Sequence, residues 1–235
     1  MQGRIDKLEK ALLEGKKIDL AEGALLASGV NTKNDFNRYL TVIDLLYQRI
    51  AQAVKGDDVE RAREIFDWLW RVRPHRHEYR GNFRLSDALE AQLGEQERVG
   101  NCLGLTVLYN VLAQRFGLQV KAVHLEDAFG IGPHVFSVLY VRGDSIDIEN
   151  ILPHGFDFQG HLGNPQREEW SDRELIADIY HSAANDFFEQ GKWEGAIENY
   201  DKALGFNPKY TKARLNKGIA LVALGRTEEA REWFR

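Results

Sequence analysis

Residues 100–141, GNCLGLTVLYNVLAQRFGLQVKAVHLEDAFGIGPHVFSVLYV, contain the change of hydrophobic period that decides the fold. Apolar residues recur at helical spacing over 103–116, which predicts a strongly apolar helix. The pattern then changes to alternation over 120–125 and to a run of β-branched and aromatic residues over 134–141, which predicts two strands. The order helix, strand, strand indicates a mixed fold rather than an all-helical one.

A third strand is expected at 145–149, where polar and apolar residues alternate again. Arg142-Gly143-Asp144 has the composition of a tight hairpin turn, with Gly143 and Asp144 as its two-residue loop. Upstream, apolar residues at helical spacing between about 5 and 71 predict amphipathic helices. We therefore expect an α+β fold with a helix-rich core and a small antiparallel sheet.

The segment downstream of these strands divides the chain. Residues 153–170 show no periodicity and hold two of the five prolines, which is typical of a long loop or linker. We expect one domain over 1–155, a linker over 156–172 and an all-helical segment over 173–235.

The helical segment repeats itself with a period of 34 residues. The matching pairs are Phe187 with Leu221, Gly191 with Gly225, Ala196 with Ala230, and Tyr200 with Phe234. These small and aromatic positions resemble the tetratricopeptide (TPR) consensus, with one full repeat and part of a second over 177–235. The resemblance implies binding of a protein or peptide partner. Asn185 and Asn216 resemble the asparagines with which some TPR proteins grip a partner's C-terminus.

The last helix of the repeats is expected to start near Thr227. It leaves Ala230, Trp233 and Phe234 without a following helix to cover them. We expect either further repeats or a homo-oligomer that covers this edge.

Composition excludes several classes of protein. The 31 Lys and Arg against 36 Asp and Glu are interspersed, so a nucleic acid partner is not expected. The start of the chain lacks a signal peptide pattern, and no apolar run suggests a membrane span. The single cysteine and the scattered histidines predict neither disulfides nor a metal site, and no phosphate-binding loop suggests a cofactor. A cytoplasmic protein is expected.

Cys102 is the candidate nucleophile. It stands in the first turn of the apolar helix, where backbone N–H groups and the helix dipole stabilise a thiolate. Gly100 and Gly104 flank it, and we expect them to leave space for a substrate. His134 opens the second strand, so its ring is expected at the rim of the sheet as a base for the thiol. The alternative is that Cys102 is a small buried apolar residue.

The acid that would orient His134 is sought on the third strand. Alternation places Asp147 and Glu149 on the same face as His134, and Glu149 lies nearer. A register change of one residue would bring in Asn150 instead. Gln96 is a candidate donor to an oxyanion, with a solvated loop residue as the alternative.

Three motifs, Arg80-Gly81-Asn82, GNCLGL at 100–105 and GPHVF at 132–136, resemble the bacterial transglutaminase-like family that joins a helical N-terminal region to TPR repeats. That superfamily is similar to papain-type cysteine hydrolases. The resemblance implies a nucleophilic Cys102 and a basic His134. The superfamily usually has Asp-Pro where Glu149-Asn150 stand here, fifteen residues after His134.

The sequence supports two hypotheses for function. The first is cysteine-dependent acyl transfer or amide hydrolysis by Cys102, His134 and an acid. Members of the transglutaminase-like branch often lack the cysteine, so the second is a non-catalytic scaffold that binds a partner through its TPR segment.

Overall fold

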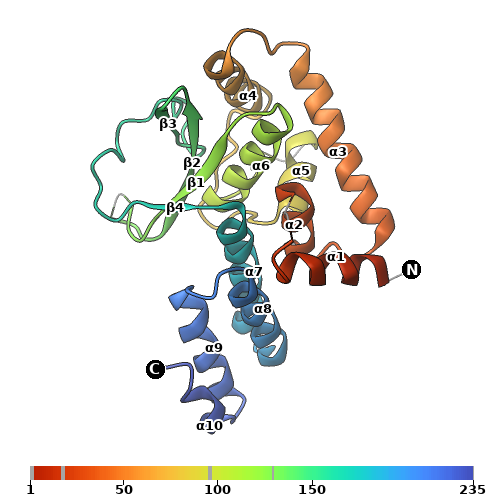
Figure 1. Ribbon diagram of the computed structural model, residues 1–235, viewed down its shortest axis with the longest axis vertical. Coiled ribbons are helices and arrows are strands. Elements are labelled where there is room, and N and C mark those ends of the chain that lie inside the picture. The colour runs from red at the N-terminus through yellow and green to blue at the C-terminus, as the bar shows by residue number, and fades with distance from the viewer. Residues whose placement is uncertain (1–2, 17–18, 95–96, 129, 235) are drawn as a thin grey trace. The chain divides into compact units, whose positions relative to one another are not determined.

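The computed structural model describes residues 3–16, 19–94, 97–128 and 130–234 (Figure 1). Its contacts divide the chain into two compact units. One unit is 32–172, and the other joins 1–31 to 173–235. The sequence placed the N-terminal residues in the first domain, whereas in the structure they group with the helical tail.

The unit of residues 32–172 combines helices with one antiparallel sheet, in the strand order β3-β2-β1-β4. Its described elements are α3 (Lys33–Ala51), α4 (Asp58–Val72), α5 (Leu85–Leu93), α6 (Cys102–Arg115), β1 (Val120–Leu125), β2 (His134–Val141), β3 (Asp144–Ile148) and β4 (Glu168–Trp170). A helix-rich α+β fold with a small antiparallel sheet is therefore confirmed.

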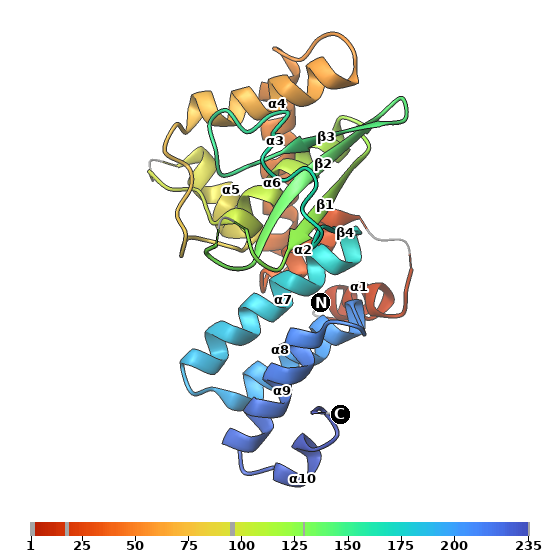
Figure 2. The same ribbon diagram turned by 90° about the vertical axis from the view of Figure 1, so that its left-hand side faces the viewer.

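Helix α6 is the centre of this unit. Every residue from Leu103 to Ala113 is buried, as expected for a helix that is apolar on all sides. It packs against β1 and β2 and also contacts α3, α4 and α5 (Figures 1 and 2). Because the strand β2 and the start of α6 adjoin, the two elements that carry the candidate residues are held rigidly together.

The loop between β2 and β3 begins one residue earlier than the sequence suggested, and this shifts the pairing of the two strands by two residues. Val141 pairs with Asp144, so the loop is Arg142-Gly143 and not Gly143-Asp144. The reason is conformational: both loop residues have positive φ, 54° and 93°, as a type I′ turn requires. A shift of two residues keeps every side chain on its predicted face.

Residues 156–172 are not a free linker. They include β4, which pairs with β1 at the edge of the sheet. Earlier in the segment, Phe158 N donates to Asp147 O at 3.0 Å, and Arg167 lies over the Phe136 ring at 5.3 Å. The segment therefore covers the sheet face opposite α6.

The other unit consists of helices. They are α1 (Gly3–Leu13), α2 (Leu20–Ala27), α7 (Asp172–Glu189), which begins at the last residue of the first unit, α8 (Trp193–Phe206), α9 (Thr211–Ala223) and α10 (Thr227–Ala230). Glu9 ties α1 to this unit, since it accepts a hydrogen bond from Tyr180 at 2.6 Å and pairs with Lys202 at 3.2 Å. These contacts explain why the N-terminal helices group with the tail.

The final helix is shorter than expected and its apolar residues are partly covered. Ala230 is buried, and Trp233 lies beneath the Lys217 ammonium at 3.6 Å. The Phe234 ring lies where a Cβ on Gly218 would come within 2.6 Å, yet Phe234 stays half exposed. None of the helices in the described part of the chain combines the length and apolar character needed to cross a bilayer.

Candidate functional site

Cys102 lies where the sequence predicted it, at the first residue of α6. Asn101 caps the helix, and its side-chain oxygen accepts a hydrogen bond from Gly104 N at 3.0 Å. The cysteine is partly exposed and forms no disulfide. Cys102 therefore stands in the first turn of α6, where backbone N–H groups have no carbonyl partner within the helix.

Gly100 and Gly104 do not leave space for a substrate, contrary to the expectation. A Cβ on Gly100 would stand 2.5 Å from the Asn82 carbonyl oxygen, and a Cβ on Gly104 would stand 2.3 Å from it. Asn82 O also accepts a hydrogen bond from Asn101 N at 3.0 Å. The glycines thus allow the preceding loop to pack on the start of α6 and fix the helix end that carries Cys102.

His134 connects Cys102 with Glu149. Its side chain forms a hydrogen bond with Cys102, and its Nε2 lies 2.7 Å from Glu149 Oε2. Burial lowers the pKa of His134, but the hydrogen bonds with Cys102 and Glu149 outweigh burial and raise it to about 10. The cluster therefore favours an imidazolium between a sulfur and a carboxylate.

Glu149 is the acid that the structure brings to His134. It is fully buried, and its N–H donates to Gly155 O at 2.8 Å, so its backbone is fixed as well. Burial raises the pKa of its carboxyl, yet hydrogen bonds from His134 and His161 outweigh burial and hold the pKa below its usual value. An ionised carboxylate accepts hydrogen bonds only, so both imidazoles donate to it.

His161 is a member of the cluster that sequence reasoning missed. Its Nε2 lies 2.8 Å from the same Glu149 Oε2. It comes from the aperiodic segment after β3, which gave no strand or helix pattern by which to place it. A histidine after a candidate acid is the one sequence signal available, and it describes His154 equally well.

Asp147 and Asn150 serve other contacts. Asp147 accepts two hydrogen bonds from Arg167, at 2.6 and 2.9 Å. The Asn150 amide donates to Ser137 Oγ at 2.8 Å, and Ser137 donates to Asn110 Oδ1 at 2.6 Å. This buried chain joins the end of β3 to β2 and α6, so Asn150 supports the site without touching His134.

His77 and Gln96 are two further polar residues to place relative to the cluster. His77 pairs with Gly100 as an isolated bridge, and burial followed by the nearby His134 lowers the pKa of its ring. It therefore stands close to the cluster as a neutral neighbour. Gln96, the candidate oxyanion donor, lies outside the described residues.

His134, Glu149 and His161 also form the one group among the described residues whose ligand atoms could hold a metal ion, all within 4.8 Å of one another. Two imidazoles and a carboxylate suit Zn²⁺. The sequence had brought no such group together. However, the two imidazole Nε2 atoms lie 2.7 and 2.8 Å from the carboxylate oxygen, which are ordinary N–H···O distances. Hydrogen bonds therefore account for the arrangement of the three side chains without a metal ion.

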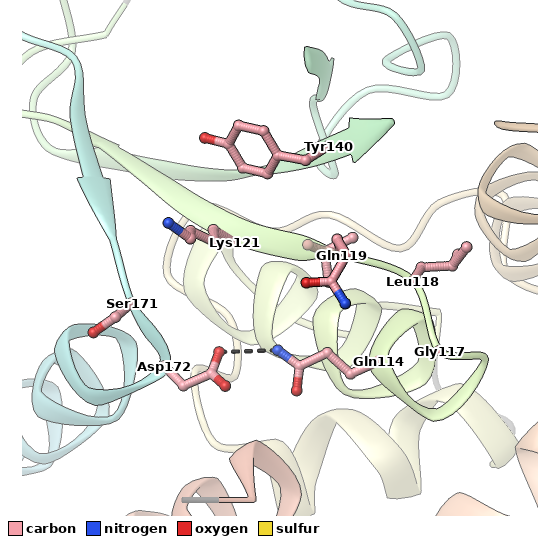
Figure 3. A pocket seen from close by; sticks show the side chains of 9 residues that line it. Gln114, Gly117, Leu118, Gln119, Lys121, Tyr140, Ser171 and Asp172 are labelled. Carbon is pink, nitrogen blue, oxygen red and sulfur yellow. Dashed lines mark hydrogen bonds between the residues drawn. The ribbon is translucent and has the colours of Figure 1, made fainter. Parts of the chain in front are cut away.

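A cavity of about 560 Å³ lies at the other end of β1 and β2, lined in part by Lys121, Tyr140 and Asp172 (Figure 3). Its polar groups are paired: Gln114 donates to Asp172 at 2.9 Å, and both Lys121 and Tyr140 bind Glu169. The cavity contains no member of the cysteine cluster, so it forms a separate feature of the unit.

In the helical unit, Asn185 and Asn216 lie together on α7 and α9. Asn216 Nδ2 donates to Asn185 Oδ1 at 3.2 Å and lies 3.2 Å from His181 Nε2. Asn185 Oδ1 also accepts a hydrogen bond from Tyr200 at 2.7 Å. The two asparagines thus join consecutive repeats, and both stay partly exposed.

A family model described as TPR repeat matches residues 184–225. The match supports a protein-interaction role, and no transglutaminase-like family matches the chain. Over 58 residues the chain is 43% identical to "Uncharacterized protein MJ0572" of Methanocaldococcus jannaschii. The chain belongs to the family of that archaeal protein. The aligned part covers 67% of MJ0572 and 25% of this chain, and the name of the archaeal protein states no activity. No solved structure matches the chain significantly.

Proposed function

We propose that the unit of residues 32–172 is a transglutaminase-like enzyme that carries out cysteine-dependent amide hydrolysis or acyl transfer. The observation that carries the proposal is the position of His134, which bonds to Cys102 on one side and to Glu149 at 2.7 Å on the other. The order of a helix-borne thiol, a strand-borne imidazole and an acid after the next strand also matches the family that the sequence resembles.

The chemistry follows from these contacts. Because Glu149 occupies Nε2, Nδ1 is the nitrogen of His134 that exchanges a proton with the Cys102 thiol. The thiolate attacks a carboxamide carbon, and the N–H groups at the start of α6 stabilise the negative charge on its oxygen. The C–N bond breaks as His134 protonates the leaving amine, which leaves a thioester. Water or another amine then attacks the thioester carbon while His134 takes its proton; the C–S bond breaks, the carboxylic acid or new amide leaves, and the Cys102 thiolate and protonated His134 are restored.

The pH dependence of alkylation by iodoacetamide tests this proposal. Cys102 is the sole cysteine, so the label reports on this site alone. We expect the native protein to react at lower pH than the His134→Ala variant, because the imidazolium stabilises the thiolate. Identical profiles in the two proteins would show that the pair is not coupled and would refute the proposal.

The second candidate function is partner binding without catalysis, and the TPR match at 184–225 favours it. Family comparison supports this role more directly than it supports catalysis. Its ligand would be a peptide with a free C-terminal carboxylate, bound by the amides of Asn185 and Asn216. Fluorescence anisotropy with such a peptide should show binding that Asn185→Ala weakens. A C-terminally amidated peptide that binds equally well would contradict the role of the carboxylate.

A further inference from the structure

We propose that His161 is a positioning residue for the acid of this site: its imidazole donates the second hydrogen bond that fixes Glu149 against His134. The inference rests on the proposed function, because it assigns to His161 a part in the chemistry of Cys102. It adds a residue from the segment that the sequence presented as a linker.

The geometry of the shared oxygen carries the argument. Glu149 Oε2 receives His134 Nε2 at 2.7 Å and His161 Nε2 at 2.8 Å. A carboxylate oxygen accepts both bonds only if each Nε2 carries hydrogen. This fixes the tautomer of a neutral His134 with Nδ1 unprotonated, which is the form that takes a proton from the thiol. A second donor on the same oxygen also limits rotation of the carboxylate.

His161 is itself held in place by packing. Its side chain is 3% exposed. Its ring stacks on Phe136 at 4.7 Å and meets the edge of Phe158 at 4.9 Å. Its backbone oxygen accepts a hydrogen bond from Arg167 at 3.3 Å. The Nε2 atom therefore points at Glu149 with little freedom, so the contact is preorganised.

The second hydrogen bond has an electrostatic consequence. A fully buried carboxylate favours its protonated form unless donors stabilise the charge. The titratable groups that face Glu149 are His134 and His161, while Ile151 N donates to the other carboxylate oxygen, Oε1, at 3.3 Å. His134 in turn faces Cys102 and His77. If His161 is removed, Glu149 takes up a proton at higher pH. The imidazolium of His134 then loses its counter-charge at a higher pH than in the native protein.

Two substitutions separate the hydrogen bond from the packing. His161→Phe keeps a ring against Phe136 and Phe158 but removes the donor. His161→Gln keeps an N–H donor of similar reach. The midpoint of Glu149 protonation is followed by NMR of ¹³C-labelled carboxyl groups, assigned with Glu149→Gln, in buffers with a chelator so that no metal ion contributes.

We expect His161→Phe to raise the Glu149 midpoint by at least about one pH unit, a tenfold change in proton affinity, and His161→Gln to restore at least half of the shift. The acidic part of the pH profile of Cys102 alkylation should also move to higher pH in His161→Phe. An unchanged Glu149 midpoint in His161→Phe overturns the inference. If His161→Phe does not fold, the pair His161→Gln and His161→Asn repeats the comparison, because the shorter amide cannot reach the carboxylate; equal midpoints overturn the inference.

The two proposals fail in different ways. Identical alkylation profiles of the native protein and His134→Ala refute the catalytic proposal, while the Glu149 midpoint still reports on His161. Phe158→Leu is the packing control: it should lower the melting temperature without moving the midpoint. A shift equal to that of His161→Phe would assign the effect to packing and overturn the inference.

Discussion

Replacing Glu149 by glutamine should uncouple His134 from its acid while keeping the shape of the side chain. Both bonds to Oε2 lose the negative charge of their acceptor, which weakens each by about 1 kcal/mol. The substitution also removes the carboxylate charge. Two unit charges about 4 Å apart attract each other by about 4 kcal/mol at an effective dielectric constant of about 20, so the imidazolium loses up to that much stabilisation. We therefore expect the pKa of His134 to fall from about 10 by roughly one to three units.

The substitution should also destabilise the fold in a pH-dependent way. The pKa of His134 is raised, so its contribution to stability is complete below its unfolded value of 6.5 and is lost as the pH rises toward about 10. The pKa of Glu149 is lowered, so its contribution is present above 4.5 and is lost as the pH falls. The loss of stability in Glu149→Gln should be greatest between these two unfolded values.

Two measurements check this prediction. NMR of the histidine side chains gives the titration of His134, and urea unfolding at several pH values gives the free energy of unfolding. Glu168→Gln is the matched control, since the same change falls on an exposed residue of β4. If Glu149→Gln moves the His134 titration no more than Glu168→Gln does, the carboxylate does not sustain the imidazolium and the reasoning fails.

Three further substitutions and one association measurement follow from the packing. Gly104→Ala should destabilise the protein by about 1–3 kcal/mol in urea unfolding, although helix propensity alone favours alanine; a gain in stability would contradict the close loop contact. Gly155→Ala places a Cβ 2.0 Å from Glu149 O, so the melting temperature should fall and the Glu149 midpoint should change; if neither moves, the strand edge is looser than described. Asp147→Asn should weaken the ion pair with Arg167 and lower stability by about 1–3 kcal/mol without moving Cys102 alkylation; a shift larger than that of Glu149→Gln would transfer the role of acid to Asp147. Light scattering should show self-association that Trp233→Glu reduces, and a strict monomer with an unchanged melting temperature would rule out the exposed edge as an interface.

Much of the fold could be predicted because its signals are local. The apolar run that became α6 and the β-branched run of β2 each determine one element through the residues they contain. The hairpin register could not be predicted in the same way, because the turn can begin at more than one of the residues that follow the strand. Arg142 adopts a positive φ that its type disfavours, and only the pairing of the whole ladder selects that turn.

The candidate site was predictable where it lies on regular elements or directly beside them. Cys102 opens a helix and His134 opens a strand, so their places follow from the elements themselves. Glu149 lies just past the end of β3, and the two-residue shift in register left its face unchanged. His161 lies in a loop whose path depends on contacts formed far from it in the chain. No period or cap in the sequence encodes such a path.

The loop that carries His161 explains why the acid stands where it does. Gly155 O accepts the Glu149 N–H, and Phe158 N donates to Asp147 O, so the loop runs along the free edge of β3 as a further pairing partner. Only glycine allows this approach, since a Cβ at position 155 would overlap the Glu149 carbonyl. The same passage stacks His161 on the Phe136 ring and places Phe158 against His161. One segment therefore closes the sheet edge, covers its outer face and delivers the second donor to the acid, so a change in its path should alter stability and thiol reactivity together.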